Sequence, residues 1–213
     1  PIQTYTGENK QALVYGFQIE AESYATSYIP TYGTSQTRAA DGCGDAGDAS
    51  TFNDSEGVLY AEIARTEDKN TYRLLGLDND SANNYIKIGF SNNNGNFWIR
   101  GVLNGTTFIS SDSLISNSPN QYYKIALKYK SGDSSLYIDG VAVLNSSTTF
   151  SGGSLNKLSF QHFTNSLDFY GKTKELIVFP KALSDLQLAI LTGATTYATF
   201  DEMALALNYT VYE

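Results

Sequence analysis

The chain has 213 residues, of which 41% are hydrophobic and 17% are charged, and its formal net charge at pH 7 is −8. This length and composition fit one large domain, and the eighteen Gly and sixteen Tyr residues favour strands and turns over helices. The negative charge argues against nucleic acid, an anionic membrane and, unless positive charge gathers locally, strongly acidic glycans as partners. No apolar run approaches the ~20 residues of a membrane-spanning helix.

Cysteine usage indicates where the chain folds. Cys43 is the only cysteine, so no intramolecular disulfide forms, and folding in a reducing cytoplasm is expected. The chain begins at Pro1 instead of Met and shows no signal peptide. We therefore expect a fragment of something longer or a processed product.

Residues 1–41 are predicted to form a strand and an extended connector. Gln11–Ile19 is apolar enough for a strand, and Glu20–Asp41 follows as a segment that Pro30 stiffens. Asp41–Asp48 is then a glycine-rich acidic loop. Its three carboxylates permit a calcium site, but the spacing lacks the full pattern of a calcium-binding loop. A solvated loop with no metal or cofactor is the favoured interpretation.

Short strands separated by turn-rich segments follow at regular intervals. The separators include Asp78-Asn79-Asp80, the stretch 91–95 and Asn104-Gly105. The predicted strands are Val58–Ala64, Tyr72–Leu77, Tyr85–Phe90, Asn96–Leu103, Thr106–Ser110, Lys157–Phe163, Leu167–Tyr170 and Lys174–Phe179. Such spacing is typical of an antiparallel sandwich or barrel.

Residues 121–143 read as three strands and two turns. Tyr123, Ile125, Leu127 and Tyr129 alternate with more polar positions, which is the period of a half-buried strand. Leu136–Ile138 leads through Asp139-Gly140, a pair that accepts positive φ, into Val141–Val143. This strand, turn and "LYIDG" hairpin resemble the signature hairpin of laminin-G-like, concanavalin-type lectin domains.

Helices are predicted only near the end of the chain. Ser184 has the position of an N-cap with Gln187 as its capping-box partner, Leu183 and Leu188 form a staple, and Gly193 closes the helix. A second helix is predicted over Thr199–Leu207. The strand before the first helix and its "ALS" start again resemble the laminin-G-like family, and this resemblance covers roughly residues 48–192.

The two flanks resemble a different group of proteins. The run "SYATSYIPT…TRAAD" within Glu20–Asp41 and the run "TFDEMA…ALNYT" within Thr199–Thr210 are similar to segments of bacteriophage and prophage tail proteins. The resemblance implies a connector over 1–41, a laminin-G-like sandwich over 42–195 and a C-terminal helix and tail over 196–213. It also implies a homo-oligomer, most simply a trimer.

Catalysis has weak support in the sequence. Concanavalin-like glycanases carry Glu-x-Asp-x-x-Glu on one strand, and this chain has no such run. Asp78, Asp80 and Asp168 are the nearest candidates, but the first two are placed in a turn and the third stands alone. His162 is the only histidine, which removes most triad and zinc arrangements. We predict no catalytic residues and no glycosidase activity.

Sugar binding has better support. A lectin site needs an exposed aromatic platform beside polar side chains. Alternation in Asn96–Leu103 turns Trp98 and Arg100 outward, and alternation in Tyr85–Phe90 does the same for Tyr85 and Lys87. Arg73 is an ambiguous addition to the face. The predicted ligand-binding residues are therefore Trp98, Arg100, Tyr85, Lys87 and Arg73. An ordinary solvated face, a subunit contact and a core position for Trp98 are the alternatives.

The sequence thus predicts an all-β, jelly-roll-like concanavalin-type sandwich of two antiparallel sheets, with two short C-terminal helices packed on its edge. The resemblance implies a carbohydrate-recognising, receptor-binding domain of a phage tail fibre or related virion protein. Its partners would be a host cell-surface glycan and other tail proteins, and its location the virion, extracellular after release from the host cytoplasm. A purely structural virion module is the competing interpretation, and a glycan hydrolase ranks last.

Overall fold

The computed structural model describes residues 16–17, 19, 28–37, 46–66, 72–92, 95–112, 116–162 and 168–193. The chain separates into two compact units, Pro1–Asp41 and Gly42–Glu213. In the first unit, residues 31–34 form a turn that the Thr34 N–H closes by donating to the Thr31 carbonyl at 3.0 Å. Residues 16, 17 and 19, the described part of the predicted strand Gln11–Ile19, are not in a strand.

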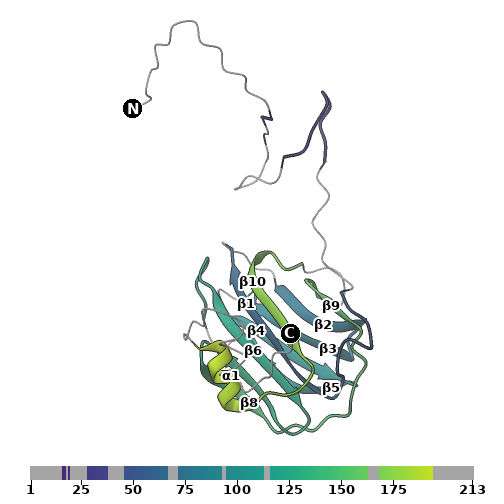
Figure 1. The fold of residues 1–213 in the computed structure, drawn as a ribbon, viewed down its shortest axis with the longest axis vertical. Helices are drawn as coiled ribbons and strands as arrows, with labels where there is room; N and C mark the ends of the chain where they lie inside the picture. The colour runs from purple at the N-terminus through teal and green to yellow at the C-terminus, as the bar shows by residue number, and fades with distance from the viewer. Residues whose placement is uncertain are drawn as a thin grey trace, which may run out of the picture. The chain divides into compact units, whose positions relative to one another are not determined.

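The second unit is a sandwich of two five-stranded antiparallel sheets (Figure 1). Sheet 1 has the order β10 (Gly171–Phe179), β1 (Glu56–Arg65), β6 (Tyr123–Lys130), β7 (Ser134–Ile138) and β8 (Val141–Ser146). Sheet 2 has the order β5 (Thr106–Ser111), β4 (Phe97–Leu103), β3 (Asn84–Phe90), β2 (Arg73–Ser81) and β9 (Lys157–Ser159). The predicted all-β sandwich is confirmed.

The main core lies between the two sheets. Alternate residues of the facing strands supply it, such as Leu59 and Leu127 from sheet 1 and Ile86, Ile88 and Ile99 from sheet 2. Burying these side chains is the main force that holds the sheets together. The period-2 pattern that predicted β6 is confirmed, because its Tyr and aliphatic positions enter this core.

Two of the predicted hairpin turns are confirmed by backbone angles. Asp139 and Gly140 have φ of 48° and 85° and connect β7 to β8, with Ile138 opposite Val141. Asn104 and Gly105 have φ of 46° and 76° and connect β4 to β5. Positive φ at both central residues defines the turn whose twist matches antiparallel strands.

Two local predictions are wrong. Asp78-Asn79-Asp80 is part of β2 and not a turn, because an irregularity between Asp78 and Ser81 lets the strand continue to a turn at 82–83. The strand predicted over Leu167–Tyr170 is also absent from 168–170, and β9 ends at Ser159. There the chain leaves the sheet, and the Phe169 N–H donates to the Phe160 carbonyl at 2.7 Å.

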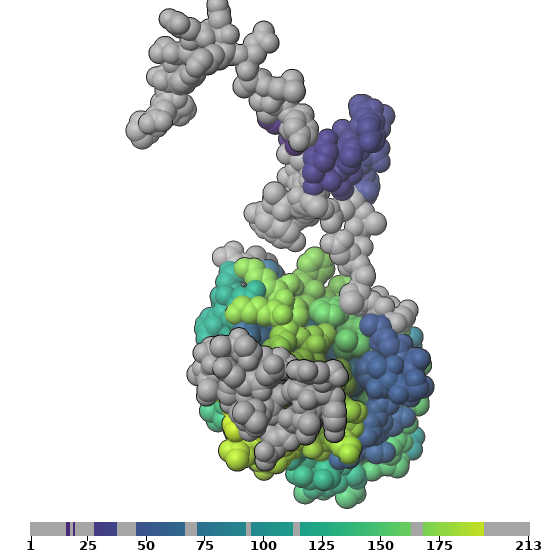
Figure 2. Space-filling view, in the orientation of Figure 1, coloured from purple at the N-terminus to yellow at the C-terminus, as the bar shows by residue number. Residues whose placement is uncertain are grey.

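Helix α1 (Asp185–Thr192) begins as predicted. The Ser184 hydroxyl accepts from the Gln187 N–H, and the Gln187 side chain accepts from the Ser184 N–H at 2.9 Å. Leu183, Leu188 and Leu191 form a second cluster with Val58, Tyr60, Ala126 and Tyr137. The helix therefore packs on the outer face of sheet 1 and not on the sandwich edge; Figure 2 views the molecule from this side.

The second predicted helix, Thr199–Leu207, lies outside the described residues. Within the part of the chain that the structure describes, no helix has the length and apolar character needed to cross a bilayer.

Candidate functional site

The outer face of sheet 2 gathers most of the residues that the sequence singled out. Strand register puts Trp98, Arg100 and Val102 of β4 opposite Gly89, Lys87 and Tyr85 of β3. Residues directly opposite each other in antiparallel strands share one face of the sheet. The same face continues through Gly76 and Asp78 of β2 to Ser159 and Lys157 of β9.

One end of this face is accessible and carries an aromatic and cationic patch. Trp98 is half-buried, and the Tyr72 ring meets its indole edge-on at 6.0 Å. Arg100 is exposed, and among the described residues no side chain forms an ion pair or hydrogen bond with it. Ser110 of β5 lies opposite Arg100 and is also exposed. We call Trp98, Arg100, Ser110 and Tyr72 the β4 patch.

Gly89 determines the shape of the β4 patch. It lies opposite Trp98 on β3, so no side chain stands beside the indole at that position. A Cβ atom at residue 89 would collide with the Arg73 carbonyl oxygen of the neighbouring strand. A larger residue would therefore strain the β2–β3 pair beside the β4 patch.

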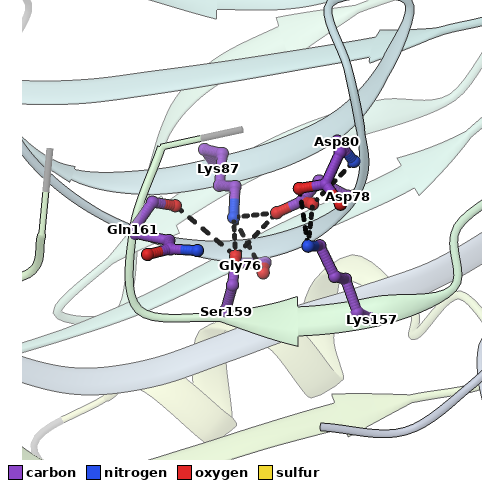
Figure 3. A network of polar contacts seen from close by, with 7 residues as sticks. All are labelled: Gly76, Asp78, Asp80, Lys87, Lys157, Ser159 and Gln161. Carbon is purple, nitrogen blue, oxygen red and sulfur yellow. Dashed lines mark hydrogen bonds and ion pairs between the residues drawn. The ribbon is translucent and has the colours of Figure 1, made fainter. Parts of the chain in front are cut away.

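The other part of the face is a buried polar network (Figure 3). Lys87 and Asp78 are both fully buried, with Lys87 Nζ 2.5 Å from Asp78 Oδ2. Lys87 Nζ also donates to Ser159 Oγ at 2.6 Å and to the Gly76 carbonyl at 3.1 Å. All three ammonium protons thus have acceptors, as a buried charge requires.

Ser159 and Lys157 complete this network from β9. The Ser159 hydroxyl donates to Asp78 Oδ2 at 2.6 Å. Lys157 Nζ lies 2.6 Å from Asp80 Oδ1 and 3.9 Å from Asp78 Oδ1 (Figure 3). The two lysines and two aspartates therefore balance in charge, and they join three strands of sheet 2.

Burial and neighbouring charges shift the pKa values of these groups. Burial lowers the pKa of Lys87 to about 8, although the adjacent Asp78 carboxylate acts in the opposite direction. Burial alone would raise the pKa of Asp78, but the charge and hydrogen bond of Lys87 and the Ser159 hydroxyl together lower it. We expect the pair to be ionised at neutral pH, because both ions are fully hydrogen-bonded.

Tyr85 and His162 lie over the same part of the face, with ring centroids 6.5 Å apart. Burial raises the pKa of the Tyr85 hydroxyl, and the Arg100 charge opposes this shift. Burial, and then the positive charge of Lys87, lower the pKa of His162. The lone histidine is therefore neutral at pH 7, and its ring lies beside that of Tyr85.

The structure separates the five predicted binding residues into three groups. Trp98 and Arg100 point outward, as predicted. Tyr85 and Lys87 lie on the predicted side of the sheet. The prediction that they are exposed is wrong, because these residues are only 4% and 0% exposed. Arg73 is also wrongly placed, since it lies opposite Phe90 on the core side and holds its guanidinium 4.8 Å from the Tyr170 ring. Whether any of the five touches a ligand stays a prediction.

Sequence reasoning missed several residues of this face. Asp78 was assigned to a turn, and neither Ser159 nor Ser110 was considered. Ser159 reaches the face only because β9 pairs with β2, which places it opposite Gly76 across more than eighty residues of chain. No pattern of neighbouring residues in the sequence predicts the pairing of β2 with β9. Tyr72 was included in the predicted strand, and only the structure shows its contact with Trp98.

Of the acidic residues considered for metal binding or catalysis, Asp48, Asp78 and Asp80 have partners, whereas Asp168 is exposed. Asp48 Oδ1 accepts from the backbone N–H and hydroxyl groups of Ser50 and Thr51, and these bonds lower the pKa of Asp48. Asp41 and Asp45 lie outside the described residues. Within the described ranges, no three His, Cys, Asp or Glu side chains cluster as metal ligands would. Asp78 and Asp80 are paired with lysines.

Two stacked antiparallel sheets with an aromatic and cationic patch on one outer face define a lectin-like β-sandwich. A laminin G-type family model, described as the concanavalin A-like lectin/glucanases superfamily, matches residues 44–189. This match covers more than half of the chain, which therefore belongs to that superfamily. No curated protein matches the sequence.

Several solved structures share the fold. The CBM40 of the Ruminococcus gnavus IT-sialidase, bound to α2,6-sialyllactose, has a TM-score of 0.56 at 15% identity, covering 74% of this chain and 96% of that one. Domain 4 of the Geobacillus stearothermophilus arabinanase AbnA, in complex with arabinotriose, has a TM-score of 0.54 at 16% identity over 68% and 70% of the chains.

The leech intramolecular trans-sialidase has a TM-score of 0.53 at 17% identity, and the match covers 68% of this chain but only 24% of that one. This chain therefore corresponds to about a quarter of that enzyme.

Proposed function

We propose that this chain is a carbohydrate-recognising, receptor-binding domain of a phage tail fibre or related virion protein, which adheres to glycans on the host surface. The observation that carries the proposal is the pairing of half-buried Trp98 with exposed Arg100 on one strand. Membership of a lectin superfamily and the similarity in fold to a CBM40 support it. The tail-protein character of both flanks supports the virion context.

The β4 patch has the chemistry that sugars require. A pyranose ring offers an apolar C–H face, which stacks on a flat aromatic surface such as the Trp98 indole. Its hydroxyl groups need donors and acceptors, which the Arg100 guanidinium and the Ser110 hydroxyl supply. Tyr72 packs edge-on against Trp98, so the indole is held in place before a ligand arrives. A preorganised site loses less entropy on binding.

The proposal includes an assembly state and a location. Three copies of the chain form a homotrimer, which contacts other tail proteins in the virion. The virion, and the domain with it, is outside the cell after its release from the host. Binding is proposed to need no cofactor, with calcium at the Asp41–Asp48 loop as the alternative. Glycan binding measured with calcium and with a chelator separates these two, and light scattering of the full chain tests the trimer.

The experiment that tests glycan binding is Trp98→Ala in the full chain, probed on a glycan array and on host cells. Loss of the indole should weaken binding by ~1–3 kcal/mol, the range for a well-used interface anchor. Because Trp98 is half-buried and contacts Tyr72, the variant should also lose some stability, but less than the ~3–5 kcal/mol of a fully buried Trp. Leu186→Ala, an exposed residue on α1, is the control and should change neither property.

Other outcomes would support the competing functions. If the wild-type chain binds no glycan on the array, and Trp98→Ala changes only its oligomeric mass, the structural virion module replaces the proposal. If the chain releases reducing sugar, and a single Asp or Glu substitution abolishes the release, the chain is a hydrolase.

A further inference from the structure

We infer that the glycan recognised at the β4 patch is acidic, and that Arg100 binds a single carboxylate on the sugar that stacks against Trp98. This inference rests on the proposed function and specifies its ligand class. The protein as a whole carries a charge of −8, so an anionic ligand needs a local reason to bind. Three features of the outer face of sheet 2 supply it.

The first feature is the unbalanced charge of Arg100. It lies directly opposite Lys87, and two like charges so placed repel each other. Asp78 balances Lys87 and Asp80 balances Lys157, which leaves Arg100 with no counter-ion among the described residues. Asp112, just beyond the end of β5, is exposed and forms no ion pair with Arg100. As far as the described residues show, a bound anion would therefore meet a positive charge that no carboxylate compensates.

The second feature is the distance between stacking platform and charge. Trp98 and Arg100 are two residues apart on one strand, so their Cα atoms are separated by roughly 6.6 Å along it. Both side chains stand on the same outer face of the sheet, Trp98 half-buried and Arg100 exposed. One sugar can therefore stack on the indole while its carboxylate turns toward the guanidinium.

The third feature is that Arg100 is a single guanidinium with no other free cation beside it among the described residues, which indicates a ligand with one carboxylate. The planar guanidinium matches a carboxylate with two parallel N–H···O bonds. Lys87 and Lys157 are buried and already paired, so they offer no further free cations to a densely sulfated or phosphorylated polymer. Asp112, just beyond the end of β5, is exposed and would repel such a polymer. The site fits one carboxylate among neutral sugars.

The test compares each acidic glycan with the same glycan after methyl esterification, which removes the charge and keeps the shape. Oligogalacturonides, glucuronate-containing oligosaccharides and sialyl-oligosaccharides are the probes, titrated into the full chain at low and high salt. The acid should bind about ten- to a hundredfold more tightly than its ester, and added salt should reduce this difference. Arg100→Gln should abolish the preference and leave ester binding almost unchanged.

A matched variant and several outcomes keep the test decisive. Lys130→Gln removes one exposed positive charge from sheet 1, so it should leave the preference intact. Equal binding of acid and ester, or an equal loss with both charge variants, would overturn the inference while leaving the proposed function in place. A higher affinity for dextran sulfate than for any carboxylated probe would also overturn it. Absence of binding to every glycan, acidic or neutral, would instead count against the proposed function.

Discussion

The outer faces of the two sheets are covered in different ways. On sheet 1, helix α1 lays Leu183, Leu188 and Leu191 over an apolar patch, and its ends are satisfied by its own caps. On sheet 2, the outer face buries an ion pair at one end, and at the other end Trp98 is half-buried and Arg100 is exposed. The outer face of sheet 1 is thus covered by a helix of the same chain. The outer face of sheet 2 holds a charge and an aromatic ring that remain available to a ligand.

The comparison separates the residues that stabilise the fold from the residues for which we propose glycan recognition. Apolar burial on sheet 1 has no directional requirement, so its contribution depends on the area buried and not on the pairing of particular groups. The network on sheet 2 requires each charge to find its partner, because an unpaired buried charge is costly. The network holds β2, β3 and β9 together, and β3 is the strand that pairs with β4 beside the β4 patch.

The largest effect is expected from Lys87→Met. Removing the ammonium leaves Asp78 buried without its main partner, which should cost about 3–5 kcal/mol of unfolding free energy. The triple variant Lys87→Met, Asp78→Leu and Ser159→Ala removes all three polar groups at once, so it should recover most of the lost unfolding free energy. Urea unfolding of both variants measures this. A single variant as stable as wild type would mean that the network contributes little.

Leu188→Ala tests the apolar side of the comparison. Leu188 is fully buried between α1 and sheet 1, so its truncation should cost about 2–4 kcal/mol. Leu186→Ala in the same helix is the control, since Leu186 is 71% exposed and should stay within about 0.5 kcal/mol. Glycan binding should survive Leu188→Ala at temperatures where the variant is folded. Loss of binding there would show that the two faces are coupled.

Ser184→Ala should have a smaller effect, about 1 kcal/mol, because it removes the side-chain acceptor at the start of α1. Thermal unfolding by circular dichroism is the measurement. Ser184→Asp restores an acceptor at the helix N-terminus and should recover most of the stability. If Ser184→Ala has no effect, the packing of Leu183 and Leu188 alone positions the helix.

The smallest effect is a pH dependence that comes from His162. Its pKa in the folded protein lies below the unfolded value of about 6.5, so on acidification the unfolded chain binds a proton first. Stability should therefore fall as pH drops from the unfolded pKa to the folded pKa, and the contribution should level off below it. His162→Gln should flatten this part of the profile. NMR titration of the single imidazole gives the folded pKa directly, and a value above 6.5 would reverse the prediction.

Much of the fold was predictable because its signals are local. The alternation in β6, the positive-φ pairs at 104–105 and 139–140, and the capping box at Ser184 each lie within a few residues. The β4 alternation likewise placed Trp98 and Arg100 correctly. The exposure of Lys87 and Tyr85 was not predictable, because alternation gives the side of a sheet but not what covers it. The polar network depends on β9, which reaches β2 from far along the chain.

The position of β1 in the middle of sheet 1 bears on the order in which the chain can fold. Its neighbours are β6 and β10, and Val58 meets Phe179 more than half the chain later. Strands β2, β3 and β4 each pair with the next strand along the chain, so β2 to β5 can form a meander as soon as they leave the ribosome. Strand β1 must wait for β6 to cover one of its edges and for β10, near the end of the domain, to cover the other. The slow step of folding should therefore be closure of sheet 1 around β1, and a chain that stops before β10 would expose one of its edges to aggregation.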